Sequence, residues 1–128
     1  MSTHVIEPAD FPHAFDTALN AGDIDRLLAL YDDDAVIRVQ SGETLSGSAA
    51  VRAEMEKLIV AKAKITNTLR HIFQHGTTAL IIVDYVLRLT MPDGMPALVN
   101  GTATNVIEVH PGRGWLMIVA NPQGTADK

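Results

Sequence analysis

Long β-rich runs fill the second half of this chain of 128 residues and constrain its fold more than any other feature. The runs cover residues 64–75, 77–91, 97–110 and 115–121, and short turn sequences rich in Gly and Pro separate them. Short turns join antiparallel neighbours, because parallel strands need a long crossover. The sequence therefore predicts an antiparallel meander in its second half.

The first half of the chain shows helical spacing instead. Apolar residues that recur every four positions predict a helix over about residues 8–20. Asp23 is placed to cap a short second helix over residues 24–31, and residues 35–40 are typical of a strand. A third helix is predicted over residues 48–63, where the first residue is a serine that can cap it. Helices followed by a meander predict an α+β fold, with the helices on one face of a curved sheet.

Composition excludes several classes of protein. The chain has no cysteine, which excludes a disulfide scaffold, a thiolate metal site and a cysteine nucleophile. Its net charge is −5 and the sequence has no cluster of Lys and Arg, so we expect binding neither to nucleic acid nor to a membrane. Nothing marks export or a spanning helix, so we expect a cytoplasmic protein. We expect one domain over residues 1–128, with 1–7 and 123–128 as loose termini.

The strand predicted over residues 77–91 has two unlike faces. One face is wholly apolar and consists of Ile81, Val83, Tyr85, Leu87 and Leu89. The other face is mixed and consists of Ile82, Asp84, Val86 and Arg88. We expect the apolar face to pack against a second copy of the chain, and the mixed face to line a cavity under the helices. The alternative is that the helices cover the apolar face and that Asp84 points to solvent.

Four segments carry a resemblance to a known family: ALNAGD at 18–23, LYDDDA at 30–35, SGSAAVR at 46–52 and WLMIVANP at 115–122. Over about residues 11–124 the chain resembles the nuclear-transport-factor-two-like superfamily, in particular its ketosteroid isomerase and SnoaL-like branch. The resemblance implies a cone-shaped fold, in which three helices wrap a strongly curved, mainly antiparallel sheet. It also implies an apolar pocket and, usually, a homodimer. The superfamily contains several kinds of enzyme and also non-catalytic modules, so the resemblance does not fix a reaction.

The resemblance also implies where a ketosteroid isomerase would keep its reacting groups. Such an enzyme uses a tyrosine, a carboxylate base and a carboxylic acid that its apolar site keeps neutral. The corresponding places in this chain hold Phe15, Val39 and Asn105. Two of these side chains are apolar, and an amide donates a hydrogen bond without moving a proton. We therefore expect no steroid isomerisation by the usual machinery.

Register arithmetic predicts a polar cluster in the pocket. Counting from the turns places His71, Asp84 and Asn105 on neighbouring strands and within reach of one another. A carboxylate beside an imidazole forms an acid–base pair, so we expect His71 and Asp84 to move protons and Asn105 to orient the substrate. The alternative is a structural network in which His71, Arg70 or Arg88 forms the polar contact with the Asp84 carboxylate. A slip of one residue would turn any of them to the opposite face.

A mainly apolar lining is expected for this pocket, formed by Phe15, Tyr31, Val39, Met55, Ile82, Val86, Ile107 and Ile118. We expect its ligand to be a small, mostly apolar organic molecule, handled without a cofactor by isomerase, dehydratase or hydrolase chemistry. A non-catalytic ligand-binding module and a dimerisation domain are the alternatives. We expect no metal site, because His71 and His75 lie about 13 Å apart on a strand, too far for one ion.

Overall fold

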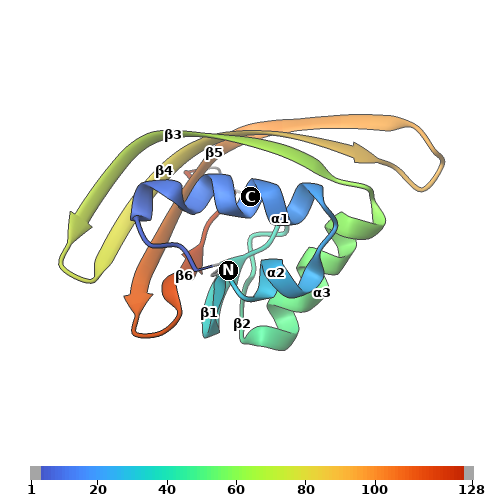
Figure 1. Ribbon diagram of the computed structural model, residues 1–128. Coiled ribbons are helices and arrows are strands. Elements are labelled where there is room, and N and C mark those ends of the chain that lie inside the picture. The colour runs from blue at the N-terminus through green and yellow to red at the C-terminus, as the bar shows by residue number, and fades with distance from the viewer. Residues whose placement is uncertain (1–3, 126–128) are drawn as a thin grey trace.

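Residues 4–125 are described by the computed structural model, and they form an α+β fold (Figure 1). The helical elements are the 3-10 helix η1 (Pro8–Asp10) and the α-helices α1 (Phe11–Asn20), α2 (Ile24–Leu28) and α3 (Ser48–Val60). The strands are β1 (Tyr31–Arg38), β2 (Thr44–Ser46), β3 (Lys64–His75), β4 (Thr78–Thr90), β5 (Pro96–His110) and β6 (Gly114–Ala120).

One mixed sheet of six strands organises the molecule, in the order β2-β1-β6-β5-β4-β3. Neighbouring strands are antiparallel except β1 and β6, which run parallel. The long strands β3, β4 and β5 curve over α1, as Figure 1 shows. The predicted α+β class and the meander from β3 to β6 are confirmed. The sheet is mainly antiparallel, as expected.

Local sequence accounts for most of the helix ends. Gly22 follows α1 with a φ of 67°, the left-handed conformation that commonly ends a helix. Asp23 caps α2, as predicted, by accepting a hydrogen bond from the Arg26 backbone N–H at 3.1 Å. The prediction that Ser48 caps α3 is wrong. Gly47, with a φ of 96°, occupies the cap position, and Ser48 is the first helical residue.

The boundary between α2 and β1 also differs from the prediction. The second helix ends at Leu28, and Tyr31 begins β1 instead of closing the helix. The Met117 backbone N–H donates to the Leu30 carbonyl at 2.8 Å, so pairing with β6 begins directly after the helix. This pairing overrides the helical spacing of the apolar residues. Strand β2 was not predicted, because three residues within a turn-rich segment show no alternation.

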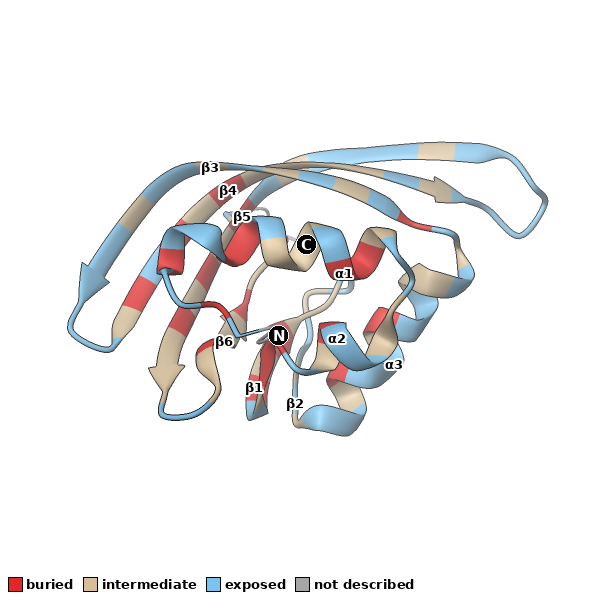
Figure 2. Ribbon diagram, viewed as in Figure 1, coloured by how far each residue is buried: buried red, intermediate tan, exposed pale blue. Residues whose placement is uncertain are grey.

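The core lies between the helices and the concave face of the sheet. Figure 2 shows buried segments on α1 and along the middle of the sheet, whereas the far end of the β4–β5 hairpin is exposed. Val5 is buried and its carbonyl accepts a hydrogen bond from the Trp115 N–H at 2.9 Å, so this part of the expected loose N-terminus is held on the body. In the expected loose C-terminus, the Gly124 carbonyl accepts from the Asn121 Nδ2 at 2.9 Å, so this part is also held on the body. Residues 1–3 and 126–128 lie outside the described part. No described helix has the length and apolar character needed to cross a membrane.

The assignment of the two faces of β4 is wrong, and the alternative holds. The apolar face of β4 points towards the helices, and Ile81 and Val83 on it are buried. The mixed face, which includes Asp84, lies on the outer side of the sheet. The helices carry their own apolar stripes, and those stripes bury the most apolar face of the sheet within one chain. The apolar face is therefore unavailable to a second copy.

Candidate functional site

A cavity of about 430 Å³ lies between α1, α3 and the concave face of the sheet. Its walls are mainly apolar and include Phe15, Met55, Leu58, Ile81, Val83 and Leu87. Polar side chains from β1 and the loop after it, from α3 and from the C-terminal segment also line it: Arg38, Gln40, Glu54, Lys57 and Gln123. Small-molecule sites have this size and this mixture of apolar walls with few polar groups.

Half of the expected lining residues lie at this cavity. Phe15, Tyr31, Val39 and Met55 line it. The other four residues do not line it. Ile82 and Val86 lie on the outer face of β4, and Ile107 is fully buried in the core. On β6 the residue that lines the cavity is Met117 and not its neighbour Ile118. Because side chains alternate along a strand, the reversed assignment of β4 alone misplaced Ile82 and Val86.

The expected acid–base pair is not formed. Asp84 lies on the outer face, where its Oδ2 accepts from the Arg70 Nη1 at 2.6 Å and its Oδ1 accepts from the Thr102 hydroxyl at 2.7 Å. These hydrogen bonds, from Thr102 first and from Arg70 second, lower the pKa of Asp84. His71 is exposed and stacks on Phe73, with 6.0 Å between the ring centroids. Within the described part no hydrogen bond joins His71 to Asp84, so the alternative with Arg70 as partner holds.

A β-bulge explains why His71 faces away from the cavity. The register of β3 against β4 shifts between Leu69 and His71, so Arg70 is an extra residue without its own partner. Beyond the bulge, the positions that face the helices are displaced by one residue. Leu69 lies inside and His71 lies outside, although their spacing of two residues predicts one shared face.

Asn105 is the one predicted polar residue that lies at the cavity. It is 8% exposed, and among the described residues it is the one buried side chain that is not hydrophobic or aromatic in type, prolines aside. Its Oδ1 accepts a hydrogen bond from the Asn121 backbone N–H at 2.8 Å. Since a backbone N–H only donates, this bond fixes the orientation of the amide. The Nδ2 group has no protein acceptor within residues 4–125, so its donors are available to a molecule in the cavity.

Tyr31 supplies a second neutral donor. The side chain lines the cavity and is buried, and its hydroxyl contacts the Met55 Sδ at 3.9 Å. Thioether sulfur is a weak acceptor, so this hydroxyl has a poor partner. Burial raises the pKa of Tyr31, which keeps the phenol protonated at neutral pH. Asn105 and Tyr31 therefore give the cavity two buried, uncharged side chains that can donate hydrogen bonds.

The polar contacts of Tyr85 and Asn67 at the cavity wall were not predicted. The Tyr85 hydroxyl donates to the Pro122 carbonyl at 2.9 Å, which holds the C-terminal segment against the wall. Asn67 also lines the cavity, and its Nδ2 donates to the Asp16 Oδ1 at 2.6 Å. Burial raises the pKa of Asp16, and the hydrogen bonds from Asn67 oppose that rise. The alternation of β4 would have identified Tyr85 if its faces had been assigned correctly, whereas no local pattern marks Asn67 or Pro122.

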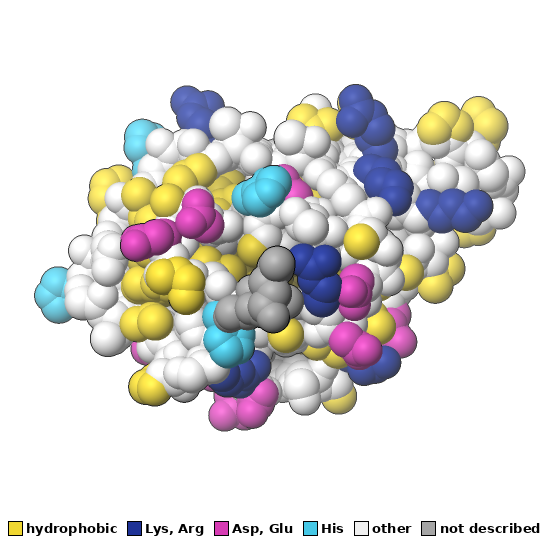
Figure 3. All heavy atoms as spheres, in the orientation of Figure 1, with side chains coloured by type: hydrophobic (Ala, Val, Ile, Leu, Met, Phe, Trp, Pro, Cys, Tyr) yellow, Lys and Arg dark blue, Asp and Glu magenta, His cyan; other side chains and the backbone are white. Residues whose placement is uncertain are grey.

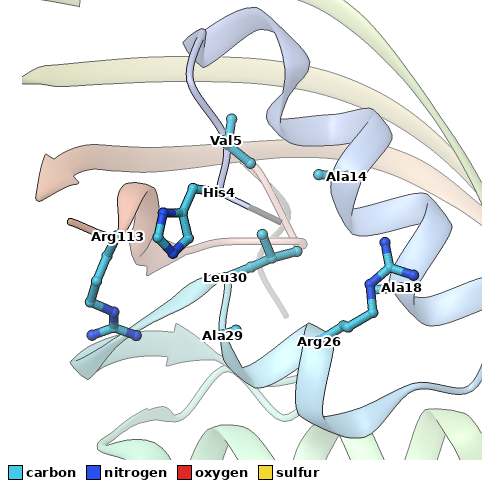
Figure 4. A pocket seen from close by; sticks show the side chains of 8 residues that line it. All are labelled: His4, Val5, Ala14, Ala18, Arg26, Ala29, Leu30 and Arg113. Carbon is cyan, nitrogen blue, oxygen red and sulfur yellow. The ribbon is translucent and has the colours of Figure 1, made fainter. Parts of the chain in front are cut away.

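A second cavity, shown in Figure 4, is too small for an organic ligand. Its volume is about 30 Å³, which is room for water. It is lined by His4, Val5, Ala14, Ala18, Arg26, Ala29, Leu30 and Arg113. Across residues 4–125, no group of three or more His, Asp or Glu side chains is placed to hold a metal ion.

Comparison with known proteins identifies the family and the fold. The family model described as SnoaL-like domain matches residues 13–115. No curated protein matches the chain. A proposed dehydratase of the NTF2-like family from Streptomyces avermitilis superposes with a TM-score of 0.76 at 19% identity, covering 88% of this chain and 90% of the other. A ketosteroid isomerase-like protein from Erwinia carotovora atroseptica has a TM-score of 0.76 at 15% identity and covers 88% of each chain.

A third similar structure carries a different description. It is a proposed calcium/calmodulin-dependent protein kinase II association domain from Xanthomonas campestris, with a TM-score of 0.74 and 24% identity. The match covers 88% of this chain and 81% of that one. At these identities the three structures share the fold, and their described activities differ.

Proposed function

Because the chain belongs to the SnoaL-like domain family, we propose that it binds a small, mostly apolar organic molecule through one carbonyl oxygen. The observation that carries this proposal is the amide of Asn105, buried at an apolar cavity with its donors unpaired. Among the described residues every fully buried side-chain nitrogen or oxygen has a hydrogen-bond partner, so the Nδ2 donors of Asn105 are open to the cavity. A ligand oxygen that accepts from them would contribute about 0.5–1.5 kcal/mol. The apolar walls would then bind the rest of the molecule by excluding water.

Binding without turnover is the function that we favour. Among the described residues that line the cavity, Glu54 is the one carboxylate, and it pairs with Lys57 at 2.9 Å. Asn105 and the neutral Tyr31 donate hydrogen bonds but do not accept a proton. The dehydratase and isomerase-like descriptions of similar structures support a second candidate, acid–base chemistry on the same ligand, with Glu54 as the proton acceptor.

The test compares a cyclic ketone with the hydrocarbon of the same shape, by calorimetric titration of the wild type and of Asn105→Leu. We expect the variant to bind the ketone about tenfold more weakly, the equivalent of one hydrogen bond, and to bind the hydrocarbon at least as well. Equal losses for both ligands, or no loss for the ketone, would refute the proposal. If the ketone is recovered chemically unchanged after incubation with the protein, the result supports binding alone. Conversion of the ketone would support the second candidate, acid–base chemistry.

Asn105→Asp provides a variant that keeps the acceptor for the Asn121 N–H. A carboxyl group donates a hydrogen bond only when it is protonated. We therefore expect ketone affinity in this variant to fall as the pH rises, whereas the wild type shows no such change. Asp84→Asn is the matched control, because Asp84 lies on the outer face of the sheet, away from the cavity. Its replacement should leave the ketone affinity unchanged at every pH.

A further inference from the structure

Exposed apolar side chains gather at one end of the molecule. They belong to the tip of the β4–β5 hairpin and to the end of α3: Val60, Met91, Met95, Leu98 and Val99. Val60 is 82% exposed and Met95 is 61% exposed. The hairpin projects beyond the helices, as Figure 1 shows, and the Thr90 N–H donates to the Ala61 carbonyl at 2.8 Å. This bond ties the hairpin to the end of α3, and we name these five residues the hairpin corner.

Three cations lie directly behind the hairpin corner. Lys64 on β3 is the register partner of Arg88 on β4, and Lys62 precedes β3. None of the three forms an ion pair within residues 4–125, although the Lys64 Nζ donates to the Asn20 carbonyl at 2.6 Å, whereas Arg70 on β3 pairs with Asp84. Figure 3 shows hydrophobic side chains at the end of the hairpin, with Lys and Arg side chains between them and the body. The sequence does not reveal this cluster, because strand pairing brings its members together.

We propose that the hairpin corner docks on an anionic lipid surface. Met91, near the tip of the hairpin, lies three residues beyond Arg88, about 10 Å along the strand, whereas Leu98 is the register partner of Arg88 and lies level with it. Apolar side chains of a surface-bound protein enter a bilayer by about 5–10 Å, so cations set back by this distance would lie at the lipid phosphates. The three cations outnumber the one carboxylate of the turn, Asp93, which accepts from the Met95 N–H at 3.0 Å. The chain has a net charge of −5, so a positive excess at this corner would also orient the molecule against a negative surface.

The shape of the corner favours a lipid surface over a second copy of the chain. A stable interface between proteins needs a broad complementary area, whereas this apolar group lies on a projecting hairpin. Cations that have no acidic partner in the same chain fit the phosphate layer of a bilayer. The sequence-based expectation of no membrane partner rested on the net charge and on the lack of a cluster of Lys and Arg in the sequence, and this proposal departs from it because the fold brings three cations together.

The hairpin corner also adjoins the cavity. Val99 is exposed at the corner and lines the cavity, together with Leu89 and Ala61 from the same end of the molecule. A molecule dissolved in the bilayer would therefore meet the cavity where the protein docks. This second step rests on the proposed function and makes the ligand a membrane-soluble carbonyl compound. The docking itself does not depend on it.

Sedimentation of the full chain with lipid vesicles, in the absence of ligand, tests the docking. We expect binding to vesicles of phosphatidylcholine with phosphatidylserine, none to phosphatidylcholine alone, and weaker binding as salt rises. Removing the apolar side chains in Met95→Ser with Leu98→Ser should reduce binding at least about tenfold. Removing the charges in Lys62→Gln with Arg88→Gln should reduce it by a similar factor, roughly tenfold or more.

Ile6→Ser and Arg26→Gln are the matched controls, since both residues are exposed and lie away from the hairpin corner. Both should bind vesicles as the wild type does. The proposal fails if the wild type does not sediment, or if controls and corner variants behave alike. It also fails if the corner variants halve the mass of the protein in solution, because the corner is then an interface between copies. Met95 and Leu98 do not line the cavity, so ketone titration without vesicles tests the proposed function separately.

Discussion

At the scale of single residues, the carboxylate of Asp84 receives two hydrogen bonds on an exposed surface, from Arg70 and Thr102. These bonds favour the ionised form and lower its pKa in the folded protein. A carboxyl group whose pKa is lower in the folded state stabilises that state above its unfolded pKa of about 3.9. This stabilisation disappears as the pH falls through the lowered pKa.

Asp84→Asn should therefore lower the Tm slightly at neutral pH, because an exposed pair contributes little. Below the ordinary pKa of aspartate the two melting curves should converge, since protonation removes the same interaction from the wild type. Thermal unfolding followed across the acid range measures both effects. Asp10→Asn is the control, because the Asp10 side chain caps no helix. A constant difference between wild type and Asp84→Asn down to the lowest pH would contradict this account.

Asn105 and His71, the two residues predicted beside Asp84, show where prediction from the sequence reached its limit. The register predicted for Asn105 was wrong, since Asn105 pairs with Ile81 and Asp84 pairs with Thr102. The prediction still placed Asn105 at the cavity, because this error and the reversed faces of β4 cancelled each other. Placing His71 needed the register of β3, where the bulge at Arg70 reverses the faces. A bulge arises from twist and packing across the sheet, and neither is encoded in the alternation of a single strand.

At the scale of elements, the contact between Gly101 and Tyr85 joins β5 to β4 at the cavity wall. The backbone of Gly101 does not lie in the left-handed region, so alanine is allowed there by conformation. A Cβ at this position would lie 3.0 Å from the Tyr85 hydroxyl and 3.2 Å from its Cζ. The hydroxyl is held by the Pro122 carbonyl, so the ring cannot move away without losing that bond.

Gly101→Ala should accordingly destabilise the fold by about 1–3 kcal/mol, the usual cost of overpacking. In the background of Tyr85→Phe, which removes the nearest atom and frees the ring, the same change should cost about 1 kcal/mol less. Urea unfolding of the four proteins in this double-mutant cycle provides the measurement. Additive effects of the two substitutions would show that a Cβ at position 101 does not clash with the Tyr85 ring.

Element positions were the part of the fold that the sequence predicted best. Four-residue spacing located α1 and α3, and Gly and Pro turns located the strands from β3 to β6. These signals are local, since each arises from the period of one element. The missed features are non-local: β1 is extended from Tyr31 by pairing with β6, and β2 exists because β1 provides a partner.

At the scale of the whole molecule, we predict that a second copy, as the family resemblance implies, binds to the outer face of the sheet. Phe73 and Leu80 are register partners on β3 and β4, and both are exposed on this face. Val106, the partner of Leu80 on β5, extends the apolar strip. The concave face is occupied by the core and the cavity. A homodimer through the sheet therefore requires this outer face.

We predict that the protein sediments as a homodimer and that Leu80→Glu converts it to a folded monomer. In a two-fold symmetric interface each substitution is present twice, so the variant would place two carboxylates into one desolvated contact. Sedimentation equilibrium over a range of concentrations measures the mass, and circular dichroism checks that the fold is retained. Ile6→Glu changes an exposed apolar residue away from the sheet and should leave the dimer intact. A monomeric wild type would show that no second copy binds. A Leu80→Glu variant that remains dimeric would show that the second copy binds elsewhere.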